Sequence, residues 1–218
     1  MDNFGRTAFG QFGEDLVIEG ILQTHGRIQR GSYVDVGAFH PLKYSNTAML
    51  HEKYGWSGLN IDANKAAIDE FQLARPLDIN LVALIGEDQS EREYVYFDHP
   101  GVNSADKKMI ERQTRNSSPF QETFRETRFS QSLSELLDRH FESNRNVDFL
   151  SVDAEGMDLE VLNSNNWDKY RPFLIAVETH GMDLDRPNDN DIYIYLSGLG
   201  YKFISQVFVT SMFIDMRL

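Results

Sequence analysis

The sequence of 218 residues contains no cysteine, and it has no apolar run near the roughly 20 residues needed to cross a bilayer. Without cysteine the chain cannot form disulfides, bind a metal through thiolates or use a cysteine nucleophile. The N-terminus lacks the basic and apolar regions of a signal peptide. We therefore expect a cytoplasmic protein without a membrane span.

Basic residues are few relative to acidic ones, and the formal net charge is -13. Such a charge repels nucleic acid, whose binding proteins usually carry a basic face, so we expect no nucleic-acid partner. One window departs from this balance, with Lys107, Lys108, Arg112, Arg115, Arg125 and Arg128. It is either a solvated helix and loop or a cationic rim that receives an anionic substrate such as a nucleotide sugar.

The apolar periodicity predicts alternating helices and strands. We expect helices at 14–24, 45–54, 64–74, from Ser132 onward, 156–163 and 188–199, and strands at 32–36, 58–61, 78–84, 93–97, 147–152, 173–177, 201–207 and 209–216. This alternation predicts a three-layer α/β sandwich with a mostly parallel sheet. The last two strands have almost no connection, so they must be antiparallel. A mixed, seven-stranded sheet that ends in a hairpin is typical of the Rossmann-like class I methyltransferase fold, whereas dinucleotide-binding domains are parallel throughout.

The length predicts a single domain over residues 1–218. Residues 1–30 form an N-terminal helical segment in this prediction. Residues 98–131 are polar and carry few apolar side chains, and a loop of that length in a compact domain is usually functional or disordered. We expect a lid or acceptor-binding insertion there, with one helix around residues 105–115.

Two strand ends carry the strongest signal for a ligand. The strand at 32–36 leads into Gly37, and the strand at 58–61 ends at Asp62. In doubly wound sheets small ligands bind at the carboxyl ends of strands, where an acid can accept hydrogen bonds from both ribose hydroxyls. The alternative is that Asp62 caps the following helix. Residues 37–41 contain a single glycine, which argues against a pyrophosphate and for a ligand without phosphates.

Several segments, in this order and spacing, resemble the FkbM-type methyltransferases. They are residues 11–15, 33–38, 45–47, 55–62, 148–156, 159–162 and 172–178. Gly10 stands where the family usually has a serine. The resemblance covers most of the chain and implies S-adenosylmethionine-dependent O-methylation, mostly of sugars in glycans and natural products.

The resemblance also implies a set of cofactor-binding residues. Asp35, Gly37 and Ala38 would line the methionine moiety, Asp62 and the adjacent Ala63 would lie at the ribose, and Leu81, Val82 and Ala83 would lie near the adenine. Ser45 and Asn46 could reach the amino-acid end of the cofactor from a helix N-terminus, or could simply cap that helix.

Alcohols are very weak acids, so a base or a metal must assist methyl transfer to a hydroxyl. Asp153, Glu155, Glu178 and His180 fall at the carboxyl ends of neighbouring predicted strands. We expect His180 to be the base, because imidazole titrates near neutral pH, although it could be an ordinary loop histidine. Asp153 and Glu155 could position the hydroxyl, or they could share a Mg²⁺ ion with Glu178, in which case Asp153 and Glu178 are the expected metal ligands. Glu155 could instead stabilise the next helix N-terminus.

His40, His99 and Asn103 are further candidates for substrate contact, because they follow the cofactor loop or begin the expected lid. The function that we expect is transfer of a methyl group to a sugar hydroxyl, on a free, nucleotide-linked or glycan-bound acceptor. The alternatives are a lipid or polyketide hydroxyl as acceptor, or a cofactor-binding module that has lost catalysis.

Overall fold

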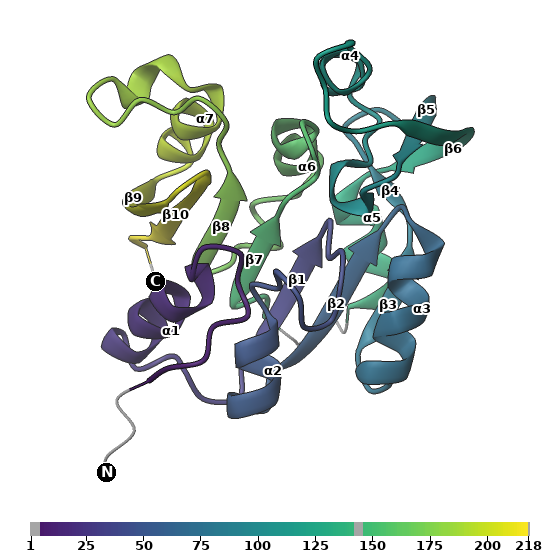
Figure 1. Cartoon of the computed structure of the whole chain (residues 1–218). Coiled ribbons are helices and arrows are strands. Elements are labelled where there is room, and N and C mark those ends of the chain that lie inside the picture. Colours follow the sequence, from purple (N-terminus) through teal and green to yellow (C-terminus); the bar gives the residue numbers. More distant parts are fainter. Residues whose placement is uncertain (1–4, 142–145, 218) are drawn as a thin grey trace.

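The computed structural model describes residues 5–141 and 146–217, so the first residues of the expected N-terminal segment, 1–4, lie outside it. A seven-stranded sheet runs through the centre in the order β3-β2-β1-β7-β8-β10-β9 (Figure 1). Its strands are β1 (Ser32–Val36), β2 (Ser57–Asp62), β3 (Ile79–Val82), β7 (Phe149–Val152), β8 (Leu174–Glu178), β9 (Tyr201–Val207) and β10 (Thr210–Asp215). β10 is antiparallel to both of its neighbours, and the pairs from β3 to β8 are parallel. The predicted mixed sheet with a C-terminal hairpin is confirmed.

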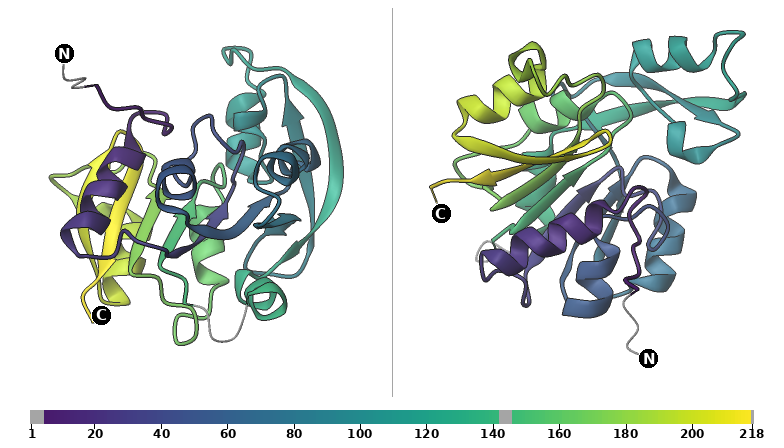
Figure 2. Two further views of the ribbon diagram at one scale, coloured as in Figure 1. Left: turned by 90° about the horizontal axis from the view of Figure 1, so that it is seen from below. Right: turned by 60° about the vertical axis from the view of Figure 1, so that its left-hand side comes forward.

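Helices cover both faces of this sheet (Figure 2). One face carries α1 (Glu14–Thr24), α2 (Ala48–Tyr54) and α3 (Lys65–Ala74), and the other carries α5 (Leu133–His140), α6 (Asp158–Asn163) and α7 (Asp191–Gly198). Apolar side chains on alternate sides of the strands supply the two cores. Tyr33 packs with Ile18 and Leu22 of α1, whereas Val34 packs with the helices opposite. Among the described residues, no helix is both long enough and apolar enough to span a bilayer.

A second, three-stranded sheet extends from one end of the first. It consists of β4 (Leu84–Ile85), β5 (Glu91–Phe97) and β6 (Glu122–Gln131) in the order β4-β6-β5, and it is joined to the short helix α4 (Lys107–Gln113). The single strand predicted at 78–84 is therefore divided between two sheets. The prediction of a polar loop after residue 97 also missed β6, whereas the helix expected around 105–115 is present as α4.

β6 escaped prediction because most of its side chains face solvent, so it lacks apolar alternation. Cross-strand pairs with β5 stabilise it instead. Arg125 donates to Glu93 at 3.0 Å, and the rings of Tyr96 and Phe124 have centroids 5.6 Å apart. Arg125 also pairs with Glu122. This arginine is thus neutralised within the ribbon, which favours the solvated interpretation of the basic window at this point over a free cationic rim.

Candidate functional site

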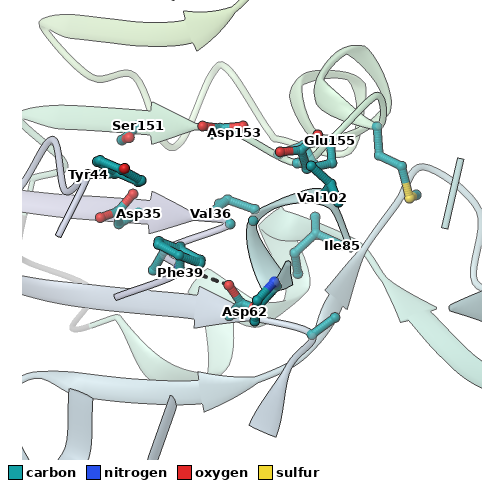
Figure 3. A pocket seen from close by; sticks show the side chains of 18 of the residues that line it. Asp35, Val36, Phe39, Tyr44, Asp62, Ile85, Val102, Ser151, Asp153 and Glu155 are labelled. Atoms are coloured by element: carbon teal, nitrogen blue, oxygen red, sulfur yellow. Dashed lines mark hydrogen bonds between the residues drawn. The ribbon is translucent and has the colours of Figure 1, made fainter. Parts of the chain in front are cut away.

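The site lies where the strand order of the main sheet reverses, between β1 and β7. In open α/β sheets such a switch point opens a crevice at the carboxyl ends of the strands. A cavity of about 370 Å³ occupies this crevice, within the usual range for small-molecule sites. Asp35 of β1, Asp62 of β2 and Asp153 after β7 contribute to its wall (Figure 3). Further wall residues come from β4 and β5 of the second sheet.

Gly37 allows β1 and β7 to approach closely at the base of the cavity. Its φ is +76°, and a Cβ at this position would lie 1.7 Å from the carbonyl oxygen of Asp153. No other residue type fits this space, because the obstacle is backbone and cannot move away as a side chain could. Ala38 follows Gly37 in the wall.

Asp35 is buried beneath this turn. Its carboxylate accepts a hydrogen bond from Thr47 Oγ1 at 2.8 Å. Burial raises the pKa of Asp35, and the hydrogen bond from Thr47 and the charge of Arg75 oppose this effect. The carboxyl group of Asp35 therefore forms an acidic floor close to Gly37.

Asp62 faces the cavity from the end of β2. Its two carboxylate oxygens accept hydrogen bonds from the backbone amides of Phe39 (2.9 Å) and Asn64 (2.7 Å). Each oxygen keeps a lone pair for a ligand hydroxyl. Burial raises the pKa of Asp62 to about 6, although both amide hydrogen bonds lower it. The cap of α3 is Asn64, whose side chain accepts from the amide of Ala66, so the interpretation of Asp62 as that helix's N-cap is wrong.

An apolar wall lies next to Asp62. Ala63 and Ala83 belong to it, and Leu84 and Ile85 of β4 complete it. Val82 does not line the cavity, and 39% of its surface is exposed. The difference arises because the chain leaves β3 at Val82 and turns into the second sheet, which brings the following residues against the cavity. A pattern of apolar residues along one strand cannot reveal that bend.

The loop at 41–47 forms another part of the wall, and a buried arginine that the sequence analysis did not single out holds it in place. Arg75 is 1% exposed. Its guanidinium donates to the Pro41 carbonyl, Thr47 Oγ1 (2.9 Å), Ser45 Oγ (3.3 Å) and the Tyr33 hydroxyl (3.1 Å). Arg75 therefore fixes the same Thr47 hydroxyl that contacts Asp35.

Ser45 and Asn46 both line the cavity, but they differ in what remains available. Ser45 Oγ accepts from the amides of Thr47 (3.3 Å) and Ala48 (3.1 Å), as a helix cap does. Asn46 Nδ2 makes a single long hydrogen bond to Ser151 Oγ at 3.3 Å. Asn46 is thus the better candidate for a ligand contact.

Aromatic rings surround one side of the cavity. Phe39 stacks on Tyr44, with centroids 6.1 Å apart and planes at 11°, and on His99, at 6.5 Å and 14°. His99 also contacts Phe120, with centroids 5.8 Å apart. Phe39 and Tyr44 both have positive φ, of 56° and 59°, which costs energy in residues with bulky side chains and is frequent at functional sites. The rings form an apolar platform that spacing in the sequence did not indicate.

Two predicted substrate residues serve the protein's own structure instead. His40 Nδ1 accepts from the amides of Leu42 and Lys43, both at 2.9 Å, and its Nε2 lies 3.1 Å from Glu70. Asn103 is buried, and its Oδ1 accepts from the amide of Phe97 at 2.9 Å. Neither lines the cavity, whereas His99 does.

Acidic groups gather with His180 beyond the ends of β7 and β8. Asp153 and Glu155 line the cavity; Glu178 and His180 lie next to it. His180 Nε2 lies 3.1 Å from Glu178 Oε2, and 42% of the imidazole side chain is exposed. Asp158, at the start of α6, was not among the predicted site residues. It accepts from the amides of Ala154 (2.8 Å) and Gly156 (3.2 Å), which folds the loop after β7 around it.

These carboxyl groups raise one another's pKa. Asp153 is exposed towards the cavity, but protein surrounds the rest of its carboxyl group. The resulting desolvation raises the pKa of Asp153, and the charges of Glu178 and Glu155 raise it further. Burial is the main cause and the charge of Glu178 the second cause that raise the pKa of Glu155 to about 8 and the pKa of Asp158 to about 7. The carboxylate of Glu178, 3.1 Å from Nε2, raises the pKa of His180. The cluster therefore contains groups that exchange protons near neutral pH.

The mixed seven-stranded sheet and a cavity at its switch point define a Rossmann-like methyltransferase fold. The sequence adds the family. The chain belongs to the FkbM methyltransferases, because the sequence model described as the methyltransferase FkbM domain matches residues 35–203. This confirms the predicted resemblance and supports a methyltransferase. Comparison with curated proteins finds none that matches the chain.

Proposed function

We propose that this protein is an S-adenosylmethionine-dependent O-methyltransferase that acts on a sugar hydroxyl. The observation that carries the proposal is the acidic lining of the cavity. Asp35, Asp62, Asp153 and Glu155 line the cavity, whereas no lysine or arginine of the described residues does. Such a wall disfavours a phosphate-bearing ligand and suits the sulfonium cation of S-adenosylmethionine.

The wall also fits the other parts of this cofactor. Asp62 offers acceptors to both ribose hydroxyls, and the apolar surface of Ala83, Leu84 and Ile85 suits an adenine ring. Gly37 leaves room for the methionine moiety, and Asn46 offers a polar contact. When bound, the cofactor would supply an electrophilic methyl group on sulfur.

The aromatic platform supports a carbohydrate acceptor. The apolar face of a pyranose ring packs well on aromatic side chains, and its hydroxyls need acceptors such as the carboxylates of Asp153 and Glu155. Phe39, His99 and Phe120 lie in the same cavity wall as these acids. The insertion at 98–131 contributes His99 and Phe120, which is consistent with the lid or acceptor-binding role predicted for it.

The proton of the acceptor hydroxyl would pass to His180. Nε2 of the imidazole lies 3.1 Å from the carboxylate of Glu178, which leaves Nδ1 to accept the proton. This arrangement of a histidine oriented by a carboxylate recurs in general-base catalysis, because the carboxylate fixes the ring and stabilises its charged form. Asp153 and Glu155 would position the hydroxyl at the cavity wall.

Calorimetry tests the cofactor first. The protein should bind S-adenosylmethionine and its demethylated product but not NAD or ATP, and Asp62→Ala should abolish the binding heat. Labelled cofactor should then transfer its methyl group to one of a panel of monosaccharides, nucleotide sugars and oligosaccharides. Transfer to lipid or polyketide hydroxyls alone would refute the sugar acceptor, and binding without transfer to any acceptor would indicate an inactive cofactor-binding module.

A further inference from the structure

Glu178 is the shared member of two groups of side chains whose metal-binding atoms converge. One carboxylate oxygen each of Asp153, Asp158 and Glu178 lie within 4.8 Å of one another. The corresponding atoms of Glu155, Glu178 and His180 satisfy the same condition. The residues come from the loop after β7, the start of α6 and the end of β8, so the sheet itself brings them together.

Glu178 shows that the convergence is more than a surface cluster of acids. Its side chain is 9% exposed. Its Oε2 is buried and receives no well-directed hydrogen bond, and the neighbouring His180 Nε2 at 3.1 Å forms an ion pair only when protonated. A buried carboxylate oxygen without a donor is costly, and it is normally satisfied by a cation or a proton.

The charges around Glu178 do not balance within the protein. Asp153, Asp158 and Glu155 add further carboxyl groups, and none of them forms an ion pair with a lysine or arginine in the part of the chain that the structure describes. The partners of Asp158 are backbone amides, which carry no net charge. His180 can offset at most one of the negative charges that these carboxyl groups carry when they are ionised.

We propose that Asp153, Asp158 and Glu178 bind a hard divalent cation, Mg²⁺ or Mn²⁺, at the inner wall of the cavity. Carboxylate oxygens are the donors that these ions prefer. The set that includes His180 would instead favour a metal that prefers nitrogen. We choose the oxygen set because Asp153 lines the cavity, which would let the ion reach the acceptor, and because it leaves His180 free as the base.

The catalytic role of the ion rests on the proposed transfer to a hydroxyl, whereas its binding does not. The ion would make the acceptor hydroxyl more acidic and hold it in place. The hydroxyl proton would pass to His180, the oxygen would form a bond to the methyl carbon, and the electron pair of the breaking carbon–sulfur bond would stay on sulfur. The products are the methyl ether and the neutral thioether form of the cofactor.

Metal binding is measured directly, without cofactor or acceptor. Protein freed of metal with a chelator is titrated with Mn²⁺, and bound ion is followed by electron paramagnetic resonance, with Mg²⁺ as competitor. We expect a single ion per chain that Mg²⁺ displaces. Glu178→Gln and Asp153→Asn should each weaken Mn²⁺ binding by at least about tenfold, since even outer partners of metal ligands typically contribute that much.

His180→Gln tests the choice of ligands, and Asp183→Asn is the control for loss of a negative charge elsewhere. Asp183 lies after β8 and pairs with Arg186. Both variants should change Mn²⁺ affinity by less than about threefold. Weak binding in His180→Gln together with normal binding in Asp153→Asn would refute the oxygen set.

Absence of Mn²⁺ binding by the wild-type protein would refute the site altogether. Thermal unfolding of each variant without metal verifies that it is folded. Cofactor calorimetry, performed separately, reports whether the proposed function fails independently of the metal site.

Discussion

Protonation of Asp62 should affect stability and cofactor binding in opposite directions. Burial raises the pKa of this carboxyl from the ordinary value of 3.8 to about 6 in the folded protein. The folded state therefore holds a proton that the unfolded state has already released between these two values. Stability from this group is fully present below pH 3.8 and is lost as the pH rises to about 6. The loss amounts to about 3 kcal/mol, at about 1.4 kcal/mol for each pH unit.

Ribose binding has the opposite sign, because hydroxyls donate to the ionised carboxylate. Binding of the cofactor should lower the pKa of Asp62, and affinity should decrease by up to about tenfold for each pH unit below 6. Above pH 7 the affinity should no longer depend on this group. The same side chain would thus destabilise the free protein at neutral pH and strengthen its complex.

Two measurements on Asp62→Asn isolate these effects from those of the other carboxyls. Urea denaturation between pH 4 and 7 should give a difference in unfolding free energy between wild type and variant that changes by about 2 kcal/mol over that range. Calorimetry should show weak, nearly pH-independent cofactor binding by the variant. Asp69→Asn removes an exposed carboxylate paired with Lys65 on α3 and should leave both profiles unchanged. A wild-type affinity that stays constant from pH 7 down to 5 would refute the assignment of Asp62 to the ribose.

Three further predictions concern other parts of the cavity. Gly37→Ala should lower the unfolding free energy by about 2–5 kcal/mol in urea denaturation, because φ is positive and the new Cβ would overlap with backbone. Gly55→Ala should lower it by only about 1–2 kcal/mol, because φ is positive there but the space is open. Equal losses in the two variants would contradict the close approach of β1 and β7 at Gly37. His180→Gln should lower kcat by about 10²–10⁴-fold and leave calorimetric cofactor affinity unchanged, and full activity would exclude it as the base. Phe120→Ala should raise KM for a sugar acceptor without changing cofactor affinity, and an unchanged KM in steady-state assays would remove this ring from the acceptor site.

The predicted sheet followed from patterns that are local to each element. A buried strand needs apolar residues along its length, and an antiparallel pair needs only a short connection, so both features are visible in the chain. β6 has neither signal, because its partner β5 and cross-strand charge pairs such as Arg125 with Glu93 stabilise it at an exposed surface. A strand of this kind is stable only when paired with another strand, and its own residues do not indicate which strand that is.

The strand ends of the cofactor side were predictable for the same reason. Gly37 and Asp62 follow directly from runs of apolar residues, and both line the cavity. Val82 was placed wrongly because the chain bends between β3 and β4. His40 and Asn103 were recognisable as polar loop residues, but only the fold shows that backbone amides occupy their acceptor atoms.

The sequence by itself determined the class of this protein: the alternating elements, the closing hairpin, and an acid and a glycine at adjacent strand ends. Tertiary structure decided which distant groups meet. Arg75 at the end of α3 lies beside Thr47 at the start of α2, because both helices cover the same face of the sheet. Glu178 and His180 lie beside Asp158 because the neighbouring parallel strands β7 and β8 bring their carboxyl ends to one edge of the sheet. Hydrophobic periodicity indicates which face of a helix or strand is buried, whereas these contacts depend on how separate elements pack. Burial within that packing also raises the pKa values on which the proposed chemistry relies.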